Sequence, residues 1–228
     1  MVQFVDSELE LLKNEVMEMW NLVYNQVQRA GEAVLTLDKD LAGQVILRER
    51  RVNAFELKID SDVEDMISLY NPVAVHLRFT LAILKINTNL ERIGDFAKGI
   101  ARFVIDLKEP AIDADLIQNL RLSEMILQVE NMMHNAREAL DKENSELANE
   151  VFSMDHLVDT INKKAPEILA EYIQKDPVHN ALDAMQLIGI FRKLERVGDH
   201  CTNIAEEIIF YLEAKIIKHK GTVKQIVT

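Results

Sequence analysis

The sequence has few residues that interrupt regular secondary structure. Seven glycines and four prolines together make up 11 of the 228 residues, or about 5%, where average usage is about 12%. Strands are joined by turns every few residues, and turns depend on Gly, Pro, Asn and Asp. The composition therefore disfavours a β-sandwich, a barrel or a repeated strand–helix–strand fold. A few long helices are expected instead.

Cysteine, long apolar runs and positive charge are also scarce. The single cysteine, Cys201, allows no internal disulfide framework and suits a reducing compartment. No apolar run approaches the roughly 18 residues of a membrane span, and no N-terminal segment has the order of a signal peptide. Because 38 acidic residues outnumber 26 Lys and Arg, for a net charge of −12, a nucleic-acid partner is disfavoured. We expect a cytoplasmic protein, peripheral to a membrane at most.

Apolar residues recur at steps of three and four along the chain, which predicts six long helices. A capping box at Ser7 and Glu10 predicts where the first helix begins, and Asn71–Pro72 predicts where the second ends. Pro166 lies inside the fifth helix and is expected to kink or interrupt it. The expected ranges are 7–37, 41–70, 73–107, 113–140, 147–176 and 177–218.

The second half of the chain repeats the first. The segment Leu90–Asp95 (LERIGD) recurs as Leu194–Asp199 (LERVGD), an offset of 104 residues, and Leu41–Ala42 recurs as Leu147–Ala148 at 106. Short connections make successive helices antiparallel. The sequence therefore predicts an all-α fold of two tandem three-helix bundles, at residues 1–110 and 111–228, that arose by internal duplication.

Acidic residues four apart occur on the second and third helices of each predicted unit. Side chains at this spacing point the same way, and an unpaired carboxylate is costly to remove from water. A cation offsets that cost, and all-oxygen ligands select Mg²⁺, Mn²⁺, Ca²⁺ or ferric iron. Asn53 stands where the pattern has an acid, and its amide still offers one oxygen. The candidate metal ligands are Glu49, Asn53, Glu91, Asp95, Asp155, Asp159, Glu195 and Asp199.

Two glycines and two histidines lie beside these acids. Gly94 and Gly198 each stand between a Glu and an Asp inside a predicted helix, where the missing side chain lets a neighbouring helix or an ion approach. His156 and His200 directly follow a candidate ligand and so point about 100° away from it. We expect these histidines at the surface or beside the ligands, with direct ligation as the less favoured alternative.

Other interpretations of the acidic residues stay open at this point. Arg92 and Arg196 precede Asp95 and Asp199 by three residues, a spacing typical of ion pairs on a solvated helix face. The chain would then be a helical scaffold or adaptor without metal. An enzyme is not expected, because the sequence has no Glu-x-x-His pair of a di-iron bundle and no phosphate-binding glycine loop. A metal-dependent phosphohydrolase is the least favoured alternative.

The duplicated motif, with the segment Leu194–Glu207 (LERVGDHCTNIAEE), resembles the PhoU family from about Ser7 to Lys218. The resemblance implies a negative regulator of phosphate uptake and of the phosphate-starvation response. The implied partners are a phosphate-sensing histidine kinase and the ATPase subunit of the Pst phosphate transporter. It also implies a homodimer and metal ions on the acidic motifs, with iron, manganese, magnesium or zinc as the candidates. The acids of the candidate set are then the ligands, and Asn53 departs from the family pattern.

Overall fold

The computed structural model describes residues 2–107, 113–218 and 222–224. Its elements are α1 (Val2–Thr36), α2 (Lys39–Tyr70), α3 (Val75–Asp106), α4 (Ala114–Asn119), α5 (Leu122–Asp141), α6 (Ser145–Lys175) and α7 (Pro177–Glu213), followed by β1 (Ile216–Lys218) and β2 (Thr222–Lys224). The predicted all-α fold with an internal duplication is confirmed, and the two short strands form an antiparallel pair after the last helix. The predicted boundary between residues 110 and 111 lies outside the described residues.

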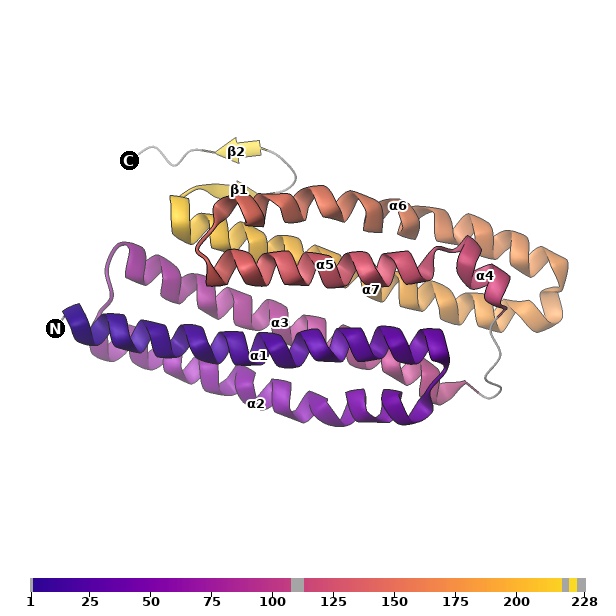
Figure 1. Cartoon of the computed structure of the whole chain (residues 1–228), viewed down its shortest axis with the longest axis horizontal. Helices are drawn as coiled ribbons and strands as arrows, with labels where there is room; N and C mark the ends of the chain where they lie inside the picture. The colour runs from indigo at the N-terminus through magenta and orange to yellow at the C-terminus, as the bar shows by residue number, and fades with distance from the viewer. Residues whose placement is uncertain (1, 108–112, 219–221, 225–228) are drawn as a thin grey trace.

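The helices form two elongated bundles that lie side by side (Figure 1). One contains α1, α2 and α3, and the other contains α5, α6 and α7 with the short α4 at one end. Contacts between α3 and α7, and between α1 and α5, join the two bundles. Fully buried side chains from both, among them Trp20, Ile83 and Phe191, belong to one hydrophobic core. No described helix is both long and apolar enough to cross a membrane.

Equivalent side chains start the second helix of each bundle. The Asp38 carboxylate accepts a hydrogen bond from the backbone N–H of Leu41 at 2.9 Å. The Asn144 side chain accepts from the backbone N–H groups of Glu146 and Leu147, at 2.8 and 3.2 Å. Both residues satisfy N–H groups that have no partner within the helix. The duplication therefore extends to the caps that set where α2 and α6 begin.

The number of helices differs from the prediction because the expected fourth helix is broken into α4 and α5. Arg121 adopts a left-handed backbone conformation, with φ of 56°, and its guanidinium donates two 2.6 Å hydrogen bonds to Glu124. Leu120 and Leu122, on either side of Arg121, are buried. The apolar pattern thus continues through a turn, which is why helical periodicity alone predicted no break there.

Helix ends also differ from the expected positions. α1 already includes Val2, so Ser7 lies inside the helix and the predicted capping box is wrong. α7 ends at Glu213, where Ala214 takes a left-handed conformation, instead of continuing to Lys218. Pro166 does not interrupt α6. Buried residues on either side of it, Ala165 and Leu169, hold this part of α6 against the core.

Candidate metal centre

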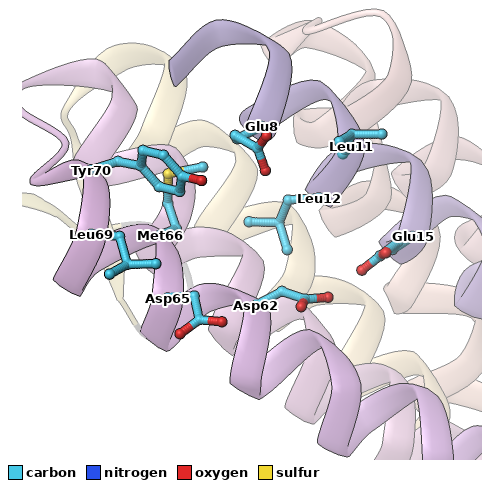
Figure 2. Close-up of a pocket in the computed structure, with 9 residues that line it drawn as sticks. All are labelled: Glu8, Leu11, Leu12, Glu15, Asp62, Asp65, Met66, Leu69 and Tyr70. Atoms are coloured by element: carbon cyan, nitrogen blue, oxygen red, sulfur yellow. The ribbon is translucent and has the colours of Figure 1, made fainter. Parts of the chain in front are cut away.

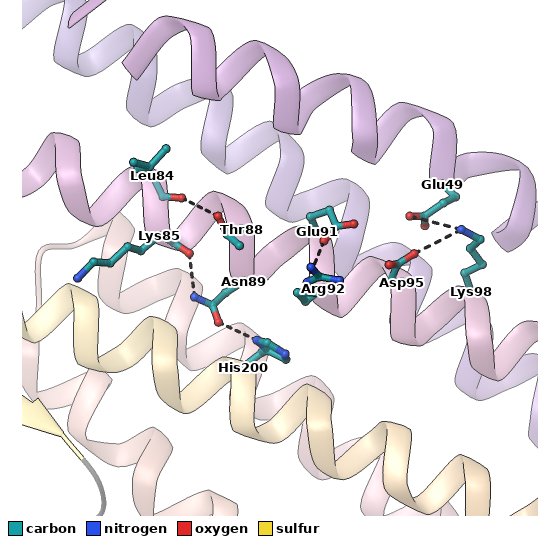
Figure 3. Close-up of polar contacts among 10 residues, drawn as sticks. All are labelled: Glu49, Leu84, Lys85, Thr88, Asn89, Glu91, Arg92, Asp95, Lys98 and His200. Carbon is teal, nitrogen blue, oxygen red and sulfur yellow. Dashed lines mark hydrogen bonds and ion pairs between the residues drawn. The ribbon is translucent and has the colours of Figure 1, made fainter. Parts of the chain in front are cut away.

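Three carboxylates from two helices of the first bundle converge at one place (Figure 3). Glu49 comes from α2, and Glu91 and Asp95 lie one turn apart on α3. One oxygen from each lies within 4.8 Å of the others. Carboxylate oxygens are the ligands that hard divalent and trivalent cations prefer. We call Glu49, Glu91 and Asp95 the acidic trio, and it contains three of the predicted ligands.

Glu49 is the most buried member of the acidic trio. It is 3% exposed, and its Oε2 has no hydrogen-bond partner. Burial raises the pKa of Glu49 to about 7, Lys98 opposes that rise, and the negative charges of Asp95 and Glu91 add to it. Burial also raises the pKa of Glu91, and Asp95 raises it further. Negative charge therefore exceeds positive charge around Glu49, and a bound cation would offset the excess.

Two basic side chains from α3 lie beside the acidic trio (Figure 3). Lys98 Nζ is 3.3 Å from Asp95 Oδ1 and 4.0 Å from Glu49 Oε1. Arg92 Nε is 3.5 Å from Glu91 Oε2, but its side chain is 58% exposed. An ion pair at such an exposed site contributes little to stability. Lys98 is therefore the more effective counter-charge within this group.

Asn53 lies one turn after Glu49 on α2 and is exposed. The hydrogen bonds of its amide are satisfied when the side-chain nitrogen faces Glu49. That nitrogen then donates to Glu49 Oε1 at 3.1 Å and to the Glu49 backbone carbonyl at 3.2 Å. In that orientation Asn53 holds the Glu49 carboxylate in place by a hydrogen bond, and its own side-chain oxygen faces away from Glu49. Its role as a ligand stays a prediction.

Gly94 allows α1 and α2 to approach α3 beside the acidic trio, in agreement with the expectation from its position in the motif. A Cβ at Gly94 would lie 3.3 Å from both Gln26 Oε1 and Val52 Cγ1, and 3.7 Å from Glu49 Oε2. Gln26 is fully buried on α1, and its Oε1 has no hydrogen-bond partner. Gln26 was not among the predicted site residues, although a polar side chain within the apolar stripe of the first helix was a usable signal.

The predicted ligands of the second bundle come from α6 and α7. Asp155 is buried, while Asp159, Glu195 and Asp199 are partly exposed. Burial raises the pKa of Glu195, and the nearby charges of Asp199, Asp159 and Asp155 raise it further. Asp199 accepts a 3.0 Å hydrogen bond from Arg196. These four acids are neighbours, but within the described residues only the acidic trio brings three ligand atoms within 4.8 Å of one another.

The surroundings of Gly198 repeat those of Gly94, with one change. A Cβ at Gly198 would lie 3.1 Å from Asp155 Oδ1, 3.5 Å from Val158 Cγ1 and 3.7 Å from Met132 Cε. Asp155 and Val158 correspond to Glu49 and Val52 at the repeat offset of 106 residues. At the same offset, Met132 stands where the first bundle has Gln26. A thioether thus replaces a buried amide at equivalent places in the two bundles.

His200 joins the two bundles. Its Nδ1 lies 2.7 Å from Asn89 Oδ1 on α3, and its ring centroid is 5.6 Å from that of Phe96. Burial lowers the pKa of His200 to about 4, with further lowering by Arg196 and Arg92.

Cys201, next in the chain, is fully buried, and that burial raises the pKa of its thiol. His156 is exposed.

A groove between α1 and α2 gathers other carboxylates (Figure 2). It has a volume of about 190 Å³ and contains Glu8, Glu15, Asp62 and Asp65 around an apolar floor. Lys58 donates hydrogen bonds to Glu15 and to Asp62, so these two acids already have a cationic partner. The groove does not share the convergent geometry of the acidic trio.

Comparisons with known proteins place the chain in a family. The PhoU domain matches it twice, at residues 16–104 and 122–208. It is 32% identical to the phosphate-specific transport system accessory protein PhoU homolog 1 of Thermotoga maritima, over 93% of this chain and 90% of that protein. It is 33% identical to the corresponding homolog of Pseudomonas aeruginosa, over 96% of this chain and 89% of that protein. The crystal structure of PhoU from Pseudomonas aeruginosa superposes with a TM-score of 0.86 at 32% identity, covering 92% of this chain and 99% of that one. The chain belongs to the PhoU family.

Proposed function

We propose that this chain is a non-enzymatic negative regulator of phosphate uptake that acts in the cytoplasm. The observation that carries the proposal is the match of the PhoU domain to both halves of the chain, each match including one copy of the duplicated acidic motif. Relatives that cover nearly the whole chain are named as accessory proteins of the phosphate-specific transport system. An accessory role requires a stable scaffold on which other proteins can dock, and two packed helical bundles form such a scaffold.

The proposed partners are a phosphate-sensing histidine kinase and the ATPase subunit of the Pst transporter. When phosphate is plentiful, the regulator would hold the kinase in its inactive state and restrain the transporter. A homodimer is part of the same proposal. Relatives named as accessory proteins of the phosphate-specific transport system support association with that system, and the kinase, the ATPase subunit and the homodimer are the finer parts of the proposal.

Metal binding at the acidic motifs is the second part of the proposal. Glu49, Glu91 and Asp95 would hold one cation in the first bundle, and its charge would offset their mutual repulsion and tie α2 to α3. Asp155, Asp159, Glu195 and Asp199 would form the corresponding site in the second bundle. The buried Glu49 Oε2 without a hydrogen-bond partner supports this assignment, as does an all-oxygen donor set suited to iron, manganese or magnesium. Zinc, which carboxylates also bind, remains among the proposed metals.

The regulatory proposal is tested with purified components. The chain is immobilised, and its binding to the cytoplasmic part of the phosphate-sensing kinase and to the Pst ATPase subunit is measured with and without Mn²⁺. We expect saturable binding to at least one of the two. A strain that lacks the protein should also express phosphate-starvation genes in phosphate-rich medium. Failure to bind either component, together with unchanged gene expression, would refute the proposal.

A metal-free scaffold is the competing function, and the ion pairs at the motifs favour it. Arg92, Lys98 and Arg196 each lie within 3.5 Å of a motif carboxylate. Elemental analysis of protein purified without chelators separates the two functions. A fall in the amount of retained metal in the double variant Glu91→Gln, Asp95→Asn supports the metal site of the first bundle. Absence of metal from the unaltered protein supports the scaffold.

A further inference from the structure

The two copies of the duplicated helix differ in charge directly after the motif. The first copy reads LERIGDFAKGIA and the second LERVGDHCTNIA, so Lys98 stands where the second copy has Thr202. The Thr202 hydroxyl donates to the backbone carbonyl of Asp199 at 2.8 Å, within its own helix. The second copy therefore places a neutral side chain where the first places an ammonium group.

Lys98 reaches from α3 to carboxylates on two helices (Figure 3). Its Nζ lies 3.3 Å from Asp95 Oδ1 on α3 and 4.0 Å from Glu49 Oε1 on α2. The lysine side chain is only 25% exposed, and that of Glu49 is 4% exposed. Attraction between opposite charges is stronger in such a partly buried place than in water. The ammonium thus supplies part of the positive charge that a metal ion would supply.

An ammonium and a metal ion cannot both occupy this position at low cost. Hard cations bind carboxylate oxygens at about 2.0–2.6 Å, so an ion shared by Glu49 and Asp95 would lie close to Lys98 Nζ and be repelled by it. The lysine stem is flexible, and its partial exposure leaves a path by which the ammonium can move to solvent. Metal binding would then include the cost of breaking both Lys98 contacts.

We propose that Lys98 is a built-in counter-ion of the acidic trio, which a metal ion must displace to bind there. This inference rests on the proposed metal binding and adds a regulatory step to it. The site of the first bundle fills only at a higher metal concentration than its carboxylates alone would require. Without metal, the lysine keeps α2 and α3 together at this point.

The test is a titration of the purified full chain with Mn²⁺, comparing the unaltered protein with Lys98→Thr, which installs the residue of the second copy. Both are studied in a Glu195→Gln, Asp199→Asn background, so that the acidic trio is the site observed. We expect the Kd for Mn²⁺ to fall about tenfold in Lys98→Thr, equivalent to about 1.4 kcal/mol. Lys164→Thr is the matched control, since Lys164 is an exposed helical lysine on α6. It should leave the Kd unchanged.

Stability without metal gives a second measurement. In EDTA, Lys98→Thr should melt at a lower temperature than Lys164→Thr, and saturating Mn²⁺ should remove that difference. If Lys98→Thr binds Mn²⁺ with a Kd within twofold of that of the unaltered protein, and Glu91→Gln abolishes this binding, the counter-ion role is overturned. The metal site itself would stand. Equal melting temperatures in EDTA would also overturn it. If neither protein binds Mn²⁺, the metal site itself is refuted, and this inference is refuted with it.

Discussion

Within the acidic trio, Glu49 is the residue whose protonation is most closely coupled to folding. Its carboxylate is buried between α2 and α3, and burial raises its pKa to about 7 from an ordinary value of 4.5. The folded protein therefore binds a proton at Glu49 more tightly than the unfolded chain does. The stabilisation that this tighter proton binding gives to the folded state therefore decreases as the pH rises from 4.5 to 7.

In metal-free buffer, the free energy of unfolding should fall as the pH rises through this window, and Glu49 should account for at most about 3 kcal/mol of the fall. Glu49→Gln removes this contribution, because glutamine does not titrate. Urea unfolding at a series of pH values, for the unaltered protein and for Glu49→Gln, isolates the contribution of Glu49 as a difference. Glu64→Gln, at an exposed acid on α2, is the control. Parallel pH curves for the unaltered protein and Glu49→Gln would contradict the assignment.

Gln26 and Met132 are equivalent residues in the two bundles and allow a reciprocal exchange. The buried Gln26 Oε1 has no hydrogen-bond partner, and such a group typically costs about 1–3 kcal/mol. Gln26→Met should raise the free energy of unfolding of the metal-free protein by about 1 kcal/mol. Met132→Gln should lower it, since it buries a new amide beside Asp155. Urea midpoints measure both changes. The Gln26 Nε2 donates to the Val45 carbonyl at 3.5 Å, so a loss of stability in Gln26→Met would show that the hydrogen bonds of the amide outweigh the cost of its buried Oε1.

At the scale of helices, the two bundles meet where small residues let them approach. A Cβ at Gly31 on α1 would lie 2.6 Å from Ile126 Cγ2 on α5, closer than two carbon atoms can be without a shift. The α1–α5 contact is one of those that join the bundles. The glycine therefore serves packing between the bundles and is not a flexible point in α1.

Gly31→Ala should destabilise the protein by about 1–3 kcal/mol, because the added methyl group overpacks the α1–α5 contact. Gly43 on α2 has no neighbouring atom within 4 Å of an added Cβ, so Gly43→Ala should stabilise by about 0.5–1 kcal/mol through its effect on helix entropy. Thermal unfolding of the two variants measures both effects. Equal shifts of the melting temperature in the same direction would contradict the proposed difference in packing between Gly31 and Gly43.

Helical periodicity predicted the long elements well, because each long helix buries one stripe along most of its length. It could not locate the break at Arg121, since Leu120 and Leu122 are both buried and the apolar pattern continues across the turn. The repeat predicted that Glu91 and Asp95 share a face and that α2 brings a further acid. The position of Gln26 on the apolar stripe of the first helix indicated a buried polar group, but the residues that it meets depend on how α1 packs against α3. Lys98 follows the motif by three residues and was not among the predicted site residues, because its reach to Glu49 on another helix leaves no pattern in the sequence.

At the scale of the whole molecule, the duplication produces two similar but unequal groups of carboxylates. Around equivalent carboxylates, the first bundle has Gln26, Asn53 and Lys98 where the second has Met132, Asp159 and Thr202. The first set includes a neutral amide in place of an acid and adds an ammonium, so its net negative charge is smaller. The two sites of the proposed regulator are therefore expected to differ in metal affinity, with the first the weaker.

We propose that Glu49, Glu91 and Asp95 together hold a cation between α2 and α3. Anomalous diffraction from crystals grown with Mn²⁺ locates such an ion. We expect an anomalous peak at bonding distance from an oxygen of each of the three carboxylates, with Lys98 Nζ moved away from Asp95 and Glu49. A map without a peak at this place, in which Lys98 keeps both contacts at saturating Mn²⁺, would contradict it.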